Sequence, residues 1–167
     1  MTAWTVLKVL HVFGGVLWMG GAIMMVFFIL PAIRATAPAG GTVMGHLSTK
    51  LKLPTVLNHA AWLTTLCGLA LFWRVSGGLD ASFFASTSGI SLTIGSIAGV
   101  LAFIGAVFIQ LPRAKRIARL SAEAAPSPSP EQTEVIAAEQ KKFALGGKIV
   151  IVCFMMSLLG MLLSHPV

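Results

Sequence analysis

Charged residues are scarce in this 167-residue chain, at 10% of the total. Soluble domains average about 25% charged residues, so a chain of this composition lacks the polar surface that water requires. Hydrophobic residues make up 56% instead. The net charge of +7 is also seen in nucleic-acid-binding proteins. The basic residues lie between apolar runs, however, as the positive-inside rule explains, so we expect no nucleic-acid partner.

The chain has two cysteines, and its apolar runs contain no acidic residue. Cys67 and Cys153 lie within apolar runs, and no Cys-x-x-Cys or Cys-x-x-Cys-His motif is present. We therefore expect neither a disulfide nor covalently attached c-type haem. No Asp or Glu lies inside the apolar runs, which excludes the carboxylate relays of proton-coupled transporters. It also leaves no acid to orient a catalytic histidine, so we expect no catalytic activity of the chain's own.

Four apolar runs are long enough to cross a membrane as helices, for which about 20 residues are needed. They extend over residues 4–30, 53–73, 89–111 and 143–163. One domain is expected for a chain of this length. The sequence therefore predicts an all-α integral membrane protein, with residues 1–167 forming one four-transmembrane-helix bundle in the lipid bilayer.

The distribution of Lys and Arg predicts the orientation of these helices. Nine of the twelve basic residues lie in the first and third connections, whereas the opposite side has Lys8 and Arg74. Because cytoplasmic loops carry the excess of basic residues, both termini are predicted to face outward. The expected location is a bacterial inner (plasma) membrane.

The third connection, residues 112–142, is predicted to form a cytoplasmic helical hairpin that extends the last two spans. Arg113 begins a stretch of helical composition, which the prolines between 125 and 130 interrupt. Ser129 can cap a new helix with Pro130 at its first position. In the first connection, apolar residues between 43 and 51 share one helical face, which favours a short interfacial helix.

Small residues form a stripe on each of the last two spans. The stripe on the third span consists of Ser91, Gly95, Gly99, Ala102, Ala106 and Gln110. The stripe on the fourth span consists of Gly146, Cys153, Ser157, Gly160 and Ser164. Because small residues let membrane helices approach closely, the stripes predict packing against another span or a second subunit.

The first two spans hold most of the polar atoms within the membrane. One stripe of span one carries Trp4, Lys8, His11, Gly15, Trp18 and Ala22. One broad face of span two carries Thr55, Asn58, His59, Trp62 and Trp73. Unpaired polar groups are costly in lipid, so both faces are predicted to point at protein.

His11 is the first candidate for a functional residue, because an ionisable side chain about two turns inside a membrane span points to function. Neutral imidazole is a common ligand of metals and of haem iron. Gly15 would leave room for a flat macrocycle, Trp18 could stack on it, and Lys8 could pair with a propionate. The alternative is a structural histidine that is hydrogen-bonded to a neighbouring helix.

His59 is a second and weaker candidate. It lies about one turn from the opposite end of span two, so its height differs from that of His11 by roughly 10–15 Å. Two histidines so far apart cannot clamp a single iron. Each could serve a separate haem, or only one is a ligand. A structural role is favoured for His59, with Asn58 and Trp62 as hydrogen-bond partners.

The first span also resembles the opening helix of two membrane protein families. The residues that carry the resemblance are Trp4-Thr-Val-Leu-Lys-Val-Leu-His11, Trp18-Met-Gly-Gly21 and Leu30-Pro31, within residues 4–31. One family is the CopD-type copper-resistance membrane domain. The other is the HemJ-type protoporphyrinogen oxidase, a haem-carrying membrane protein.

This resemblance implies that His11 is a haem ligand with Trp18 as its companion and Lys8 near the same site. HemJ-type sequences have an arginine directly after Leu-Pro and a lysine in a later helix. Here Ala32 follows Pro31, and span three has no lysine. The oxidase activity is therefore not carried over to this chain.

Three functions remain open on the sequence. The first is a small membrane subunit that binds haem b through His11 and supports electron transfer or a redox complex. The second is a cofactor-free accessory subunit, which forms a homo-oligomer or docks on a larger membrane complex through its small-residue stripes. The third is a component of copper or small-solute transport, which the CopD resemblance implies.

Overall fold

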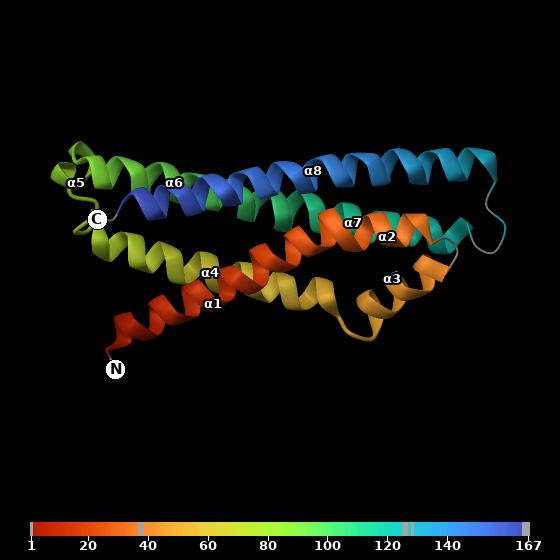
Figure 1. The fold of residues 1–167 in the computed structure, drawn as a ribbon, viewed down its shortest axis with the longest axis horizontal. Coiled ribbons are helices and arrows are strands. Elements are labelled where there is room, and N and C mark those ends of the chain that lie inside the picture. The colour runs from red at the N-terminus through yellow and green to blue at the C-terminus, as the bar shows by residue number, and fades with distance from the viewer. Residues whose placement is uncertain (1, 37–38, 125–126, 128, 165–167) are drawn as a thin grey trace.

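The computed structural model describes residues 2–36, 39–124, 127 and 129–164. It confirms the predicted all-α, four-helix membrane fold. The four helical stretches that are long and apolar enough to span a membrane are Ala3–Ala35, Leu53–Val75, Thr87–Ala124 and Pro130–Leu163. Figure 1 shows them side by side along the long axis of the molecule, with the first span beginning where the fourth span ends.

The first and third spans each contain one wide, π-helical turn. The first span consists of α1 (Ala3–Met24), η1 (Met25–Ile29) and α2 (Leu30–Ala35). The third consists of α6 (Thr87–Ile104), η2 (Gly105–Gln110) and α7 (Leu111–Ala124). In both spans a Leu-Pro pair, with Pro31 or Pro112, follows the wide turn. Proline lacks an N–H and clashes with the carbonyl four residues earlier, and a wide turn lets the helix continue past it.

The remaining helices complete the bundle. The first connection contains α3 (Ala39–Thr49), the short helix that the sequence predicts there. The second span is α4 (Leu53–Val75), and the short α5 (Ala81–Ala85) follows it. The fourth span is α8 (Pro130–Leu163). Figure 1 shows α7 and the first part of α8 forming a hairpin at one end of the molecule.

A capping box starts α8 at the predicted residue. The Ser129 hydroxyl accepts a hydrogen bond from the Gln132 N–H, and the Gln132 side chain accepts one from the Ser129 N–H. Pro130 occupies the first helical position, where its missing N–H costs nothing. These local signals confirm that the new helix begins at this point.

The bundle is built from two closely packed helix pairs, α1 with α4 and α6 with α8. The pairs meet at a central aromatic cluster, which we define as Trp18, Trp62, Phe103 and Phe154. The ring centroid of Trp18 lies 4.5 Å from that of Phe154 and 6.3 Å from that of Phe103, and Trp62 lies 4.8 Å from Phe103. All three contacts are edge-to-face, the preferred geometry of aromatic pairs.

The two predicted small-residue stripes face each other along α6 and α8. A Cβ placed on Gly95 would lie 2.9 Å from the Cα of Gly160, and one on Gly99 would lie 2.9 Å from the hydroxyl of Ser157. Ala102 on the same stripe is completely buried. The stripes therefore serve packing within the chain.

The prediction that the broad polar face of α4 points at protein is wrong for most of that face. Thr55, His59 and Trp73 are exposed and Asn58 is half-buried, whereas Trp62 is partly exposed but packs against Phe103. The buried face consists of small residues instead: Ala60, Ala61, Thr64 and Cys67. This face is buried because α1 approaches α4 closely, and only small side chains fit between the two helices.

Candidate functional site

His11 on α1 is hydrogen-bonded to the backbone of α4. Its Nδ1 atom lies 2.8 Å from the carbonyl oxygen of Thr64, which is 53 residues away in the sequence. A carbonyl oxygen can only accept, so Nδ1 is the donor and carries the proton. In the neutral form of the ring the lone pair is then on Nε2, the nitrogen that is available to a ligand.

Gly68, one turn after Thr64 on α4, makes room for this imidazole. A Cβ on Gly68 would lie 2.7 Å from Cε1 and 3.0 Å from Nδ1 of His11. Any larger residue would therefore displace the ring. Gly68 was not predicted as a site residue from the sequence. A glycine in the middle of a membrane span, where no turn is formed, nevertheless indicates that another helix approaches closely.

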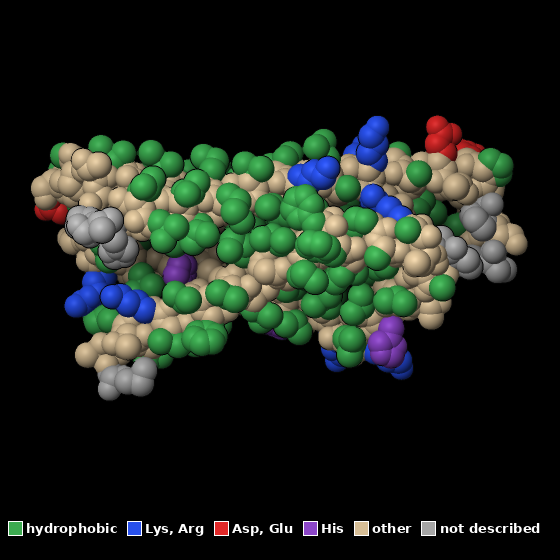
Figure 2. Space-filling view, in the orientation of Figure 1, with side chains coloured by type: hydrophobic (Ala, Val, Ile, Leu, Met, Phe, Trp, Pro, Cys, Tyr) green, Lys and Arg blue, Asp and Glu red, His purple; other side chains and the backbone are tan. Residues whose placement is uncertain are grey.

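The Nε2 atom of His11 makes no hydrogen bond within the described part of the chain and is not fully buried. The ring as a whole is half-buried. Figure 2 shows that the surface is hollowed between the first half of α1 and the last half of α8, with basic side chains at the open end. Metal-binding histidines are commonly held in this way, with one ring N–H on a carbonyl and the other nitrogen on the metal.

Gly15 and Trp18 have packing roles in the structure. A Cβ on Gly15 would make an ordinary contact with Cγ2 of Thr64, at 3.6 Å, so α4 occupies the space that the sequence left for a macrocycle. Trp18 is 5% exposed and belongs to the central aromatic cluster. Gly14, which the sequence analysis missed, is packed more tightly, since its Cβ would lie 2.5 Å from the Thr64 hydroxyl.

Two basic residues lie toward the end of the molecule where α1 begins. Lys8 is exposed, about one turn from His11 on α1. Arg74 on α4 lies over the ring of Trp4, with its guanidinium carbon 4.4 Å from the ring centroid. This cation–π contact holds a second cation near the end of the α1–α4 pair at which α1 begins. Arg74 was not predicted from the sequence as a residue near this site, because Trp4, its contact on α1, is far away in the chain.

The structure keeps His59 apart from His11. His59 lies nine residues before Gly68 on α4, which corresponds to roughly 13 Å along the helix axis, and its side chain is exposed. Within the described ranges there is no group of three or more His, Cys, Asp or Glu side chains that could hold a metal ion. Cys67 and Cys153 are both free thiols.

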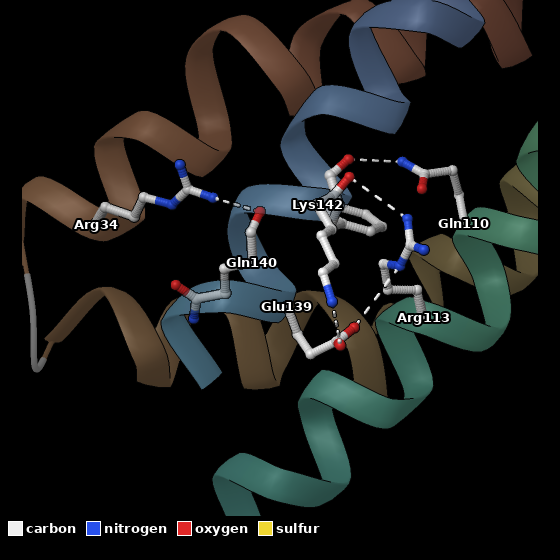
Figure 3. A network of polar contacts seen from close by, with 7 residues as sticks. Arg34, Gln110, Arg113, Glu139, Gln140 and Lys142 are labelled. Atoms are coloured by element: carbon white, nitrogen blue, oxygen red, sulfur yellow. Dashed lines mark hydrogen bonds and ion pairs between the residues drawn. The ribbon is translucent and has the colours of Figure 1, made fainter. Parts of the chain in front are cut away.

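A second polar cluster lies at the base of the α7–α8 hairpin (Figure 3). Glu139 on α8 is 8% exposed and contacts two cations, Nε of Arg113 at 3.7 Å and Nζ of Lys142 at 3.5 Å. The Arg113 guanidinium also donates to the Lys142 carbonyl at 3.5 Å. A buried carboxylate requires such partners, so the network holds α7 against α8.

Neighbouring side chains tie two further elements to the same part of α8. The Gln110 side-chain amide, at the end of η2, donates to the Phe143 carbonyl at 2.7 Å. Its buried oxygen has no partner among the described residues and lies over Gly146, where a Cβ would approach it to 2.6 Å. Arg34 of α2 donates to the Gln140 carbonyl at 3.3 Å. Each contact joins a side chain of another element to the backbone of α8, so η2 and α2 are held against this part of α8.

No protein-family model, curated protein or solved structure matches this chain. Its function is therefore inferred from its own residues and their geometry.

Proposed function

We propose that this chain is a small membrane subunit that binds haem b through Nε2 of His11 and supports electron transfer or a membrane redox complex. The hydrogen bond from Nδ1 of His11 to the Thr64 carbonyl, at 2.8 Å, carries the proposal. It sets the tautomer and the orientation of the ring, as the partners of metal-bound histidines do. The resemblance of residues 4–31 to the opening helices of the CopD-type and HemJ-type families also supports His11 as the haem ligand.

The surroundings of His11 suit part of a haem group. The hollow lies between the first half of α1, which carries the half-buried ring of His11, and the last half of α8. Lys8 and Arg74 supply positive charge toward the outer end, where the propionates would lie. One protein histidine is enough to hold haem iron, with the sixth position open or filled from elsewhere. Because His59 lies too far along α4, a second ligand would come from another chain or a non-histidine group.

The orientation of the bundle belongs to the same proposal. Nine of the twelve Lys and Arg residues lie in the connections at the end formed by α2, α3 and the α7–α8 hairpin. We place this end in the cytoplasm and the start of α1 outside, in a bacterial inner membrane. A reporter inserted at Ser121 should read as cytoplasmic and one fused after Leu163 as exterior. The reverse pattern would refute the orientation.

The absorption spectrum of the purified protein tests the haem proposal. Protein extracted in mild detergent from haem-replete cells should show a Soret band. His11→Ala should abolish this band, whereas His59→Ala, the matched control on α4, should retain it. Circular dichroism should show that both variants keep their helices. Wild-type protein without a Soret band, or a band that survives His11→Ala, would overturn the proposal.

The same hydrogen bond favours a second candidate, a cofactor-free accessory subunit. The imidazole already joins α1 to α4 through Thr64 and needs no ligand to be useful. In that case the wild type has no Soret band and elutes with a larger membrane complex. His11→Ala would then lower thermal stability by the loss of one hydrogen bond, about 1 kcal/mol.

A further inference from the structure

Charge is layered along the α7–α8 hairpin. An exposed basic layer lies near the start of α7, at Lys115, Arg116 and Arg119. An exposed acidic layer lies toward the tip, at Glu123, Glu131 and Glu134. Figure 2 shows acidic side chains at the far end of the hairpin and basic side chains closer to the bundle.

Helix geometry places the basic layer at, and just beyond, the depth of the lipid headgroups. The apolar part of the third span ends at Leu111. At 1.5 Å per residue, Lys115 and Arg119 lie roughly 6 and 12 Å beyond Leu111, and Glu123 lies roughly 18 Å beyond it. The headgroup region extends about 5–8 Å outside the hydrocarbon core. The basic side chains can therefore reach phosphate groups, whereas the acidic tip stands in water.

The internal polar network leaves these cations available. Glu139 is neutralised by Arg113 and Lys142, which lie at the base of the hairpin. Lys115 and Arg116 form no ion pair with any residue that the structure describes. Arg119 pairs with Glu123 at 3.6 Å, but these side chains are 72% and 60% exposed. An exposed pair of this kind is weak and competes poorly with a phosphate group.

We propose that the base of α7 binds the phosphate groups of anionic phospholipids through Lys115, Arg116 and Arg119. Basic segments next to a membrane span are attracted to anionic lipid surfaces. Guanidinium groups, in addition, match phosphate oxygens with paired hydrogen bonds. The same negative surface repels the acidic tip, so the hairpin stands upright and its tip stays away from the bilayer. This interaction is independent of any haem at His11.

Lipid selectivity in nanodiscs tests this proposal. The full-length protein is placed in nanodiscs made from equal parts of phosphatidylglycerol and phosphatidylcholine, and the lipids that remain bound are identified by native mass spectrometry. Wild type should retain phosphatidylglycerol in preference to phosphatidylcholine. The double variant Lys115→Gln/Arg116→Gln should lose this preference by roughly five-fold for each cation removed. High salt should weaken the preference of the wild type.

A matched control changes the same number of charges in the same hairpin. Glu131→Gln/Glu134→Gln removes two acidic side chains at the tip and should keep or raise the preference for phosphatidylglycerol. An equal preference in wild type and in Lys115→Gln/Arg116→Gln would overturn the proposal. So would inorganic phosphate that displaces the retained phosphatidylglycerol, because the site would then be one for free phosphate.

Discussion

Gly160 of α8 lies so close to Gly95 of α6 that a Cβ on Gly160 would come within 2.5 Å of the Gly95 Cα. The nearest atoms are backbone, which cannot rotate away as a side chain can. The α6–α8 pair therefore depends on the absence of one side-chain atom at each position.

Gly160→Ala should consequently destabilise the protein. Inserting one methyl group into a close backbone contact typically costs about 1–3 kcal/mol, which should lower the thermal unfolding midpoint measured in detergent. Gly20→Ala is the matched control, since no atom lies within 4 Å of its Cβ position. The control should be neutral or slightly stabilised, because alanine favours a helix over glycine. Equal midpoints for the two variants would contradict the described packing.

Gly68→Ala should displace the His11 ring from its position against α4. The new methyl group would lie 2.7 Å from Cε1 of the ring, so the imidazole must rotate and lose its bond to the Thr64 carbonyl. We expect a loss of about 1 kcal/mol in stability and, under the haem proposal, a weakened or shifted Soret band. Gly15→Ala on the same helix pair meets Thr64 only at 3.6 Å and should lower neither the stability nor the Soret band. A Gly68→Ala variant that behaves like Gly15→Ala would contradict the position of the ring.

Glu139 and Glu123 are both paired with cations, but their surroundings predict different responses to mutation. Glu139 is 8% exposed and is shared by Arg113 and Lys142, whereas the Glu123 carboxylate is 60% exposed in its pair with Arg119. Glu139→Gln should cost about 1–3 kcal/mol because it leaves Arg113 without its buried partner. Glu123→Gln should change stability by less than about 0.5 kcal/mol. The thermal unfolding midpoints of the two variants, measured side by side, test this difference. Equal losses of stability would show that Glu139 is not a structural partner of Arg113.

The carboxyl of Asp80, which lies between the second and third spans, should have a pKa below its ordinary value. Hydrogen bonds from the hydroxyl and the backbone N–H of Ser82 lower the pKa of its carboxyl below the ordinary value of 3.8. A lowered pKa in the folded state means a stabilising contribution that is complete above pH 3.8 and is lost as the pH falls through the lower folded value. Ser82→Ala removes the hydroxyl bond and should raise the pKa of Asp80. Carbon NMR titration measures the pKa of the Asp80 carboxyl in the wild type and in Ser82→Ala. An unchanged pKa in the variant would refute the role of the Ser82 hydroxyl.

Local patterns in the sequence were enough to predict the four spans, but not the π-helical turns η1 and η2 or the short helix α5. Hydropathy depends only on neighbouring residues, so the four spans followed from runs of apolar side chains. The Ser129 cap and the short helix in the first connection were predicted for the same reason. The packing stripes of α6 and α8 followed from helical periodicity, which tells which residues share a face.

The candidate site was only partly predictable, because periodicity does not say which neighbour a face meets. His11 was chosen from its residue type and depth, but its partners, the Thr64 carbonyl and Gly68, belong to a helix more than 50 residues away. A backbone carbonyl has no signature in a sequence. Trp18 was expected beside His11 and lies instead in the central aromatic cluster, because α6 and α8 approach α1 at that level.

The sequence by itself determined that the chain has four helices able to span a membrane, that the last one begins after Ser129, and which small residues pack. The tertiary structure alone decided which face of α4 is buried, because close approach at Gly14 selected small residues over polar ones. It also decided that Nδ1 of His11 donates and that Nε2 stays available. Both outcomes depend on the distance between two helices, which no pattern along a single helix contains.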